Sequence, residues 1–324
     1  MNMLARNIAV AHEQPRLSDE ARVYLAAARN RFDVAGIRAA FHRADQLNIL
    51  FVGETIIDEY RYVSPLAKPS KEFILATVEA REPEQFLGGV IAASLHGEWK
   101  NTTVVTDDGE PIKKTRYVED GTARKVFEAY SKQRLELSEF QRRAFRERLI
   151  PAVMDADAVV VFDFGHGLID GGDRFIVNKA QFLAVNAQTN AGNYGFNPVT
   201  KYKRAELICI DLPEAQLAAG EPLDAVAAHD ALSGRGFGHA IITHGRQGCY
   251  CPQHIPAFGS RAIDTMGAGD AFLAVTAPLV AAGLDLEAAA FVGNVAGAIK
   301  TDIVGHRRHV GRDELLQAIE GLLA

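Results

Sequence analysis

Five mainly apolar runs are spaced along the chain, and each ends at or beside a glycine or a polar residue. They are residues 47–52, 158–162, 182–185, 205–210 and 240–243. Short runs of this kind are typical of strands that are buried on both faces of a parallel sheet. Helical patterns separate several of the runs. The alternation therefore predicts an α/β fold with a mostly parallel sheet, helices on both faces, and a ligand cleft along the carboxyl edge of the strands.

Capping residues mark several of the predicted helices. Ser18 and the acidic pair after it predict a helix start, and a short second helix is expected over 34–41. Ser138 and Gln141 form a capping box that opens a helix over 138–154. Asp285 is expected to cap a helix over 286–300. We therefore expect residues 1–46 to form an N-terminal helical extension and residues 47–324 to form the main domain.

The composition narrows the class of protein. The 324 residues are 48% hydrophobic and 23% charged, which is ordinary for a globular protein. A net charge of −6 does not favour a nucleic-acid partner. No apolar run approaches the ~20 residues that span a bilayer, so a membrane is not expected as a partner. The three cysteines suggest no disulfide framework, and a cytoplasmic location is expected.

The stretch 264–270, with the sequence DTMGAGD, carries the clearest chemistry. Gly267 and Gly269 flank Ala268, so the backbone can turn tightly and present amide groups with little obstruction. The apolar run that follows predicts a helix, and its amino-terminal end attracts anions. Asp270 falls in the first helical turn. An anion site beside a carboxylate suits phosphoryl transfer to a hydroxyl group, in which a base accepts the proton of the alcohol.

This stretch resembles the carboxyl-terminal signature of the ribokinase/PfkB carbohydrate kinases. The resemblance implies that Asp270 is the catalytic base and that Gly267, Ala268 and Gly269 form the anion hole. It also implies a ribokinase-like, doubly wound sheet with a small β lid. The lid and the substrate half would lie at about 54–120, and the nucleotide-binding half at about 158–324.

Further runs match the substrate side of that family. Asp58 matches a sugar-binding acid, and Gly88-Gly89 matches a second signature, although Ala92 stands where the family has an asparagine. Asp163 begins a run that resembles the heptose-phosphate kinases, the subgroup of ADP-heptose synthesis. The amide-rich segment that begins at Asn186 could bind a polyhydroxylated ligand or simply build turns. Two further candidates, for a substrate phosphate, are Lys114 and Arg116, although basic residues on a strand are by default solvated.

The nucleotide side is assigned by the same resemblance. Asp211 and Glu214 follow a strand, and Glu214 would act on Mg²⁺ through water, as suits a hard cation that keeps its waters. ATP would be bound by residues of the later strand and helix, which are Thr243, Gly245, Gly248 and Asn294. The loop 305–309 could close the ATP site or hold a monovalent cation, although its two arginines argue against the cation.

One segment departs from the family pattern. Only five residues separate the predicted strands 102–106 and 112–118. A parallel crossover needs about a dozen residues, so the spacing predicts a hairpin and a shortened substrate half.

Taken together, the sequence predicts an ATP-dependent kinase of a sugar or a sugar phosphate. Two alternatives stay open: a non-catalytic sugar- or nucleotide-binding relative, and a nucleoside kinase. The resemblance further implies a homodimer formed through the lid, and a separate nucleotidyltransferase as a partner. No run G-x-x-x-x-G-K-[ST] occurs, which argues against a Walker-type nucleotidase.

Overall fold

The computed structural model describes residues 17–67, 72, 74–122, 124–193, 195–259 and 262–324. In this part of the chain an eight-stranded sheet forms the centre, in the order β13-β12-β11-β10-β9-β8-β1-β5. Its strands from β5 to β11 are parallel, and β12 and β13 extend it as antiparallel neighbours. The bounds are β1 Ile49–Gly53, β5 Thr102–Val105, β8 Ala158–Asp163, β9 Phe182–Ala187, β10 Ala205–Asp211, β11 Phe237–Thr243, β12 Cys249–Cys251 and β13 Gln253–Ile255.

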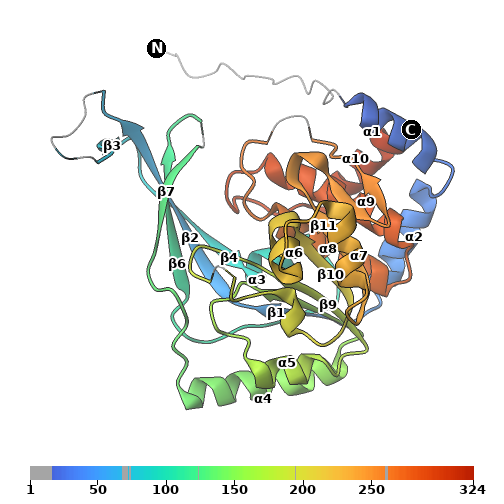
Figure 1. Ribbon diagram of the computed structural model, residues 1–324, viewed down its shortest axis with the longest axis horizontal. Helices are drawn as coiled ribbons and strands as arrows, with labels where there is room; N and C mark the ends of the chain where they lie inside the picture. Colours follow the sequence, from blue (N-terminus) through green and yellow to red (C-terminus); the bar gives the residue numbers. More distant parts are fainter. Residues whose placement is uncertain (1–16, 68–71, 73, 123, 194, 260–261) are drawn as a thin grey trace, which may run out of the picture.

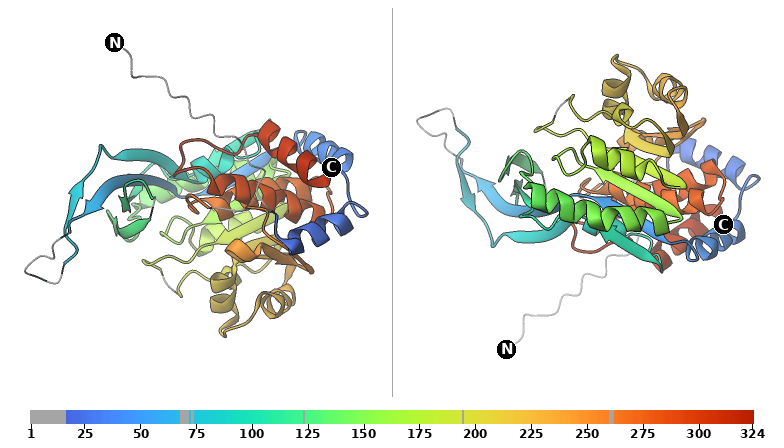
Figure 2. Two further views of the ribbon diagram at one scale, coloured as in Figure 1. Left: turned by 90° about the horizontal axis from the view of Figure 1, so that it is seen from above. Right: turned by 90° about the horizontal axis from the view of Figure 1, so that it is seen from below.

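Helices cover both faces of this sheet, as Figure 2 shows. One face carries α1 (Asp19–Ala28), α2 (Val34–Ala44), α3 (Val90–Ser94), α8 (Ala268–Ala281), α9 (Leu286–Thr301) and α10 (Arg312–Leu323). The other carries α4 (Glu139–Asp155), α5 (Gly171–Val177), α6 (Leu212–Ala219) and α7 (Ala225–Ser233). Successive residues of β8 show the alternation, since Val160 belongs to the first core and Val161 to the second. All five predicted parallel strands are present, which confirms the predicted α/β architecture.

A smaller sheet extends from one side of the body (Figure 1). Its strands are β2 (Thr55–Pro65), β3 (Thr77–Glu79), β4 (Glu84–Gly89), β6 (Ile112–Glu119) and β7 (Lys125–Tyr130). The order is β3-β2-β6-β7, and β4 also pairs with β2. Strands β2 and β6 run parallel, with Asp58 opposite Lys114. We call this sheet the lid, because it carries residues that line the cleft described below.

The predicted hairpin of residues 102–106 and 112–118 is wrong. Strand β5 pairs with β1 in the central sheet, whereas β6 pairs with β2 and β7 in the lid. The short loop therefore crosses from one sheet to the other. A loop too short for a parallel crossover demands a hairpin only when both strands belong to the same sheet. The segment thus completes an edge of the central sheet and supplies the middle of the lid.

The predicted helix starts are confirmed. Ser18 caps α1, Ser138 forms the capping box of α4 with Gln141, and Asp285 caps α9. Helices α1 and α2 lie before the predicted boundary at residue 46, and they contribute Leu25 and Ile37, among others, to the first core. Residues 1–16 of the predicted extension lie outside the described residues. Among the described helices, none combines the length and the hydrophobicity that crossing a membrane requires.

Candidate active site

A cleft of about 840 Å³ opens at the carboxyl edge of the central sheet, between the lid and the start of α8. Most of the predicted site residues line it, although they come from segments more than 200 residues apart. These are Asp58, Gly89, Lys114, Arg116, Asn186, Asp211, Glu214, Thr243, Gly245, Gly248, Gly267, Ala268, Gly269, Asp270 and Asn294. The two predicted residues that do not line it are Gly88 and Asp163.

The start of α8 has the form that the glycines predict. Gly267 is its N-cap residue, with a φ of 72° that an L side chain rarely adopts. The first turn-closing bond of the helix runs from the Ala271 amide to the Gly267 carbonyl (2.9 Å). Within the described part of the chain, the amides of Gly269 and Asp270 donate no bond to another backbone group. They are therefore placed to receive an anion at the positive end of the helix.

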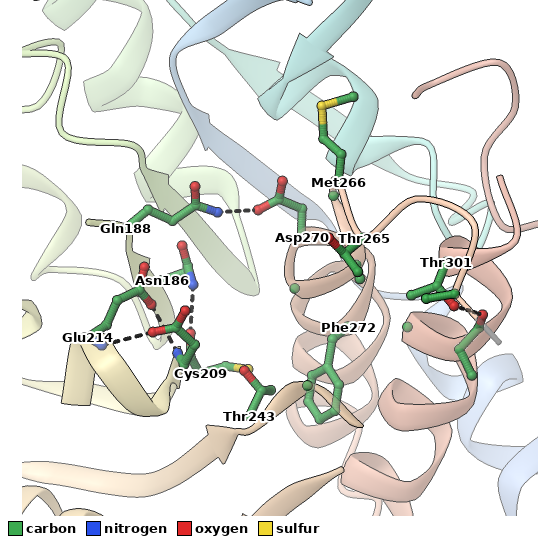
Figure 3. A pocket seen from close by; sticks show the side chains of 18 of the residues that line it. Asn186, Gln188, Cys209, Glu214, Thr243, Thr265, Met266, Asp270, Phe272 and Thr301 are labelled. Atoms are coloured by element: carbon green, nitrogen blue, oxygen red, sulfur yellow. Dashed lines mark hydrogen bonds between the residues drawn. The ribbon is translucent and has the colours of Figure 1, made fainter. Parts of the chain in front are cut away.

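Asp270 projects from this turn toward the opposite wall of the cleft. The Gln188 side-chain amide donates to its Oδ1 atom (2.6 Å), as Figure 3 shows. Burial raises the pKa of Asp270 to about 6, even though His306, Lys114 and Lys300 pull it downward. A carboxylate with that pKa is ionised near neutral pH and is a better base than an ordinary aspartate.

On the lid side of the cleft, two basic side chains contact one acid. Arg116 and His306 both contact the Asp58 carboxylate, the latter with Nε2 3.4 Å from Oδ2. Burial alone would raise the pKa of Asp58, but the bonds from His306 and the Arg116 charge outweigh it and hold the pKa at about 2. Asp58 is therefore ionised at neutral pH. Arg116 also pairs with Glu128 (3.1 Å).

Lys114 differs from Arg116 because its charge is less compensated. Its side chain is 7% exposed and lines the cleft. Among the described residues no carboxylate lies within ion-pair distance of its ammonium, which sits 5.3 Å from the centre of the Tyr130 ring. Burial lowers the pKa of Lys114, and the Asp58 charge works against that shift. This ammonium is the cation on the lid side that is best placed to meet an anionic ligand.

The two glycines at the end of β4 serve different purposes. Gly89 lines the cleft and has a φ of 66°, which lets the chain turn into α3. Gly88 lies outside the lining, but a Cβ atom there would come within 2.3 Å of Asp58 Oδ2. The absence of a side chain at Gly88 therefore makes room for the Asp58 carboxylate.

The ends of β8 and β9 place Asp163 and Asn186 in different surroundings. Asp163 is buried behind the cleft wall, where it accepts a bond from the Tyr202 hydroxyl (2.6 Å) and pairs with Lys201 (2.5 Å). Asn186 lines the cleft and donates to the Cys209 carbonyl (2.8 Å). Its Oδ1 atom is buried without a partner among the described residues, and an unpaired buried acceptor is costly unless a ligand or water meets it.

Two acids, Asp211 and Glu214, lie together at the end of β10. Asp211 and Glu214 form a capping box at the start of α6, and the Thr189 amide also donates to Glu214 (2.9 Å). Burial, and then the neighbouring Asp211 charge, raise the pKa of Glu214 to about 8. A bound cation would relieve this repulsion. The described residues contain no cluster of three or more side chains that could hold a metal ion.

The remaining lining residues surround the far end of the cleft. Thr243 ends β11, and Gly248 has a φ of 90°, where a Cβ atom would meet the Ile255 carbonyl at 2.0 Å. Asn294 of α9 lines the cleft and donates to the Pro256 carbonyl (2.8 Å). The loop after β11 and the small residues of α9 thus line the space beyond the start of α8.

Two residues of the site were not singled out by sequence reasoning. Gln188 lies two positions beyond Asn186, in the amide-rich segment, and only the fold shows which amide meets Asp270. His306 belongs to the loop that was assigned to ATP closure or a cation, and it contacts Asp58 of the lid. Each contact joins residues that are far apart in sequence, so no local pattern could have identified it.

Part of the chain matches a known protein family. Residues 199–308 match the family described as pfkB family carbohydrate kinase. "Bifunctional protein HldE" of Shewanella sp. (strain W3-18-1) is 26% identical over 316 residues, and that of Shewanella loihica is 24% identical over 315. Both matches cover 86% of this chain but 64% of the relative, so the chain spans less than two thirds of the length of these curated relatives.

Solved structures share the fold. Ribokinase from Thermotoga maritima superposes with a TM-score of 0.65 at 17% identity, over 85% of this chain and 99% of its own. Phosphofructokinase-2 from Escherichia coli superposes with a TM-score of 0.65 at 14% identity, over 86% of this chain and 99% of its own. The predicted ribokinase-like fold is thereby confirmed.

Proposed function

Because the chain carries a pfkB family carbohydrate kinase domain in a ribokinase-like fold, we propose that it transfers the γ-phosphate of ATP to a hydroxyl group of a sugar or a sugar phosphate. One observation carries the proposal. Asp270 stands in the first turn of α8, beside backbone amides that can bind a phosphate, and inside a cleft that also holds cationic and acidic groups from the lid and from β10.

In the proposed reaction, Asp270 accepts the proton of the attacking hydroxyl group. Gln188 holds the carboxylate by one oxygen, which leaves the other for the substrate. The amides of Gly267, Gly269 and Asp270 would stabilise the negative charge on the transferring phosphoryl group, because they lie at a helix start without a backbone acceptor among the described residues and need no reorganisation. The acceptor and the phosphate would thus meet over one turn of helix.

Glu214 and Asp211 would help to hold Mg²⁺ together with the phosphates of ATP. The ion, when bound, neutralises part of the phosphate charge and orients the γ-phosphate. ATP itself would lie along the far end of the cleft, against Thr243, Gly245, Gly248 and Asn294. The Asp211 side chain is relatively open, whereas Glu214 is buried, so a role through a bridging water suits Glu214.

A phosphorylated sugar suits the lid side better than a plain sugar. Asp58, which is held ionised, can accept bonds from sugar hydroxyl groups, and Asn186 offers an unpaired oxygen. Lys114 supplies a buried positive charge without a carboxylate partner among the residues described. A phosphate group on the acceptor would neutralise that charge. Asp163, by contrast, would support the wall and would not touch the substrate.

The wider setting is also a proposal. We expect a cytoplasmic homodimer formed through the lid, where apolar side chains such as Val78, Leu87 and Phe127 are more than half exposed. The relatives named bifunctional are longer than this chain, and a separate nucleotidyltransferase is the partner that we propose for the product.

The test is an ATP-consumption screen with Mg²⁺ over heptose phosphates, hexose phosphates, unphosphorylated sugars and nucleosides. We expect turnover with a sugar phosphate and its loss in Asp270→Asn. Lys114→Met should raise the KM for the phosphorylated sugar more than it lowers kcat. Turnover of nucleosides alone would identify a nucleoside kinase. ATP binding without transfer to any acceptor would identify a non-catalytic relative.

A further inference from the structure

Lys300, on the last turn of α9, is a buried cation that the proposed mechanism does not use. Its side chain is 0% exposed, which is rare for a lysine. The ammonium donates to the Met266 carbonyl (2.7 Å) and to the Gly305 carbonyl (2.8 Å). Both of these partners among the described residues are backbone carbonyls, so the charge is held by peptide dipoles.

The two carbonyls belong to the loops on either side of the catalytic turn. Met266 directly precedes Gly267, the N-cap residue of α8, and Gly305 directly precedes His306, which contacts Asp58. Asp264 connects the same two loops, because its carboxylate accepts hydrogen bonds from the Gly305 amide (2.9 Å) and the Met266 amide (3.1 Å). The Lys300 ammonium and the Asp264 carboxylate therefore hold the loop that precedes Gly267 against the loop that follows α9.

The bond to Met266 also fixes the direction of the next amide. In a trans peptide the carbonyl and the following N–H point in opposite directions. Holding the Met266 carbonyl toward the ammonium therefore turns the Gly267 N–H away from it. The lysine stem passes close beneath the turn, since a Cβ atom on Gly267 would lie 3.3 Å from Lys300 Cε. A side chain at this position can thus set the orientation of the anion hole.

An ammonium between carbonyl oxygens is in the environment that proteins also provide for a dehydrated K⁺ ion. Burial lowers the pKa of Lys300, while the charges of Asp264 and Asp270 raise it again. The two carbonyl oxygens and the negative charges of Asp264 and Asp270 are the features that stabilise a positive charge at this point, whether the charge belongs to a side chain or to an ion.

We propose that Lys300 is a positioning residue that takes the place of a monovalent cation: its tethered ammonium holds the Met266 and Gly305 carbonyls and so orients the anion-hole amides without an added ion. The proposal rests on the proposed function for its effect on turnover. The sequence suggested that loop 305–309 could hold a monovalent cation. In this proposal the Lys300 ammonium supplies that positive charge.

The activity test compares the wild type, Lys300→Ala and Lys125→Met in KCl, NH₄Cl, NaCl and choline chloride at equal ionic strength. Lys125 is the matched control, because its ammonium contacts Asp264 (3.1 Å) from a more exposed position. We expect wild-type kcat to vary less than twofold among the salts. In choline chloride, Lys300→Ala should have a kcat at least 100-fold below that of the wild type, and K⁺ or NH₄⁺ should raise it at least tenfold. The kcat of Lys125→Met should differ less than threefold from that of the wild type and should not depend on the salt.

A second test does not depend on the substrate. Crystals of Lys300→Ala soaked in Rb⁺ should show an anomalous peak between the Met266 and Gly305 carbonyls, and K⁺ should raise the Tm of this variant but not that of the wild type. Activation of the wild type more than tenfold by K⁺ would overturn the proposal. The proposal would also be overturned if K⁺ left the Tm of Lys300→Ala unchanged and the Rb⁺ soak gave no anomalous peak between the two carbonyls. If no acceptor is found for the wild type, only the kinase proposal fails, and the Rb⁺ and Tm results still test the proposal about Lys300. If Lys300→Ala does not fold, the response of the wild type to the four salts still tests it.

Discussion

Replacing Asp270 with asparagine should lower activity and raise stability at the same time. The asparagine side chain would have nearly the same shape, and its oxygen could still accept the bond from Gln188 that Asp270 now accepts (2.6 Å). What the change removes is the negative charge and the ability to take a proton. A residue with a purely structural role would instead lose stability together with activity.

The expected loss of activity follows from general-base catalysis, which typically contributes about 10²–10⁴-fold to kcat. The amides at the start of α8 stay in place, so ATP should bind with unchanged affinity. Only the step that moves the proton of the acceptor hydroxyl is impaired. The loss in kcat corresponds to about 3–5 kcal/mol of transition-state stabilisation.

The expected gain in stability follows from the pKa. Burial raises the pKa of Asp270 from 3.8 to about 6, so the fold disfavours the ionised form. The resulting cost is absent below about pH 4, grows as the pH rises through 6, and is complete above it. A shift of this size corresponds to about 3 kcal/mol of unfolding free energy. Because the side chain is partly open to the cleft, we expect a gain of about 1–3 kcal/mol at pH 8.

Urea unfolding at pH 5 and pH 8, with kcat and ATP titration calorimetry on the same preparations, measures both effects. Asp107→Asn is the matched control, since burial also raises the pKa of Asp107 but this residue does not line the cleft; its kcat should stay within twofold of the wild type. Normal turnover by Asp270→Asn, or a loss of stability at pH 8 equal to that at pH 5, would refute the reasoning.

Three further predictions follow from the same contacts. The pH profile of kcat/KM should fall tenfold per unit below about pH 6, because Asp270 must be ionised to act as a base; a flat profile down to pH 5 would exclude this residue. Glu214→Gln should raise the Mg²⁺ concentration needed for half-maximal rate at least tenfold while the sugar KM changes little, and an unchanged Mg²⁺ requirement would count against the metal assignment. Gly293→Ala should lower the free energy of unfolding by about 1–3 kcal/mol, because the new Cβ atom would lie 2.0 Å from Thr276 Oγ1. Gly321→Ala has open space and should be neutral or stabilising in thermal unfolding, so equal effects of the two substitutions would contradict the packing argument.

The sequence predicts the central sheet well because its strands are buried on both faces. Such strands are continuous apolar runs, and the polar residues that end them fall at one edge of the sheet. Local signals also locate helix starts, since a cap such as Ser138 or Asp285 acts within three residues. These features depend on neighbours in sequence, which is why reasoning from the sequence finds them.

The lid was harder to predict because its strands find partners far along the chain. The segment 112–118 pairs with β2 and not with the strand just before it. Strand β7 is mostly exposed, so it lacks the apolar run of a buried strand. Sequence spacing limits which connections are possible, but it does not say to which of two sheets a strand belongs.

The site residues also differ in how far the sequence identifies them. The start of α8 and its aspartate form one local motif, which the sequence shows directly. The contacts of Gln188, His306 and Lys300 join loops that meet only in the fold. Asp163 illustrates the reverse case, because this polar residue at a strand end faces Tyr202 and not the cleft.

The most direct test of the central claim is a crystal structure of the protein with Mg²⁺ and a non-hydrolysable ATP analogue. We expect the terminal phosphate within hydrogen-bond distance of the Gly267, Gly269 and Asp270 amides, next to the Asp270 carboxylate, with the metal near Glu214. A nucleotide bound elsewhere, or phosphates turned away from the start of α8, would contradict it.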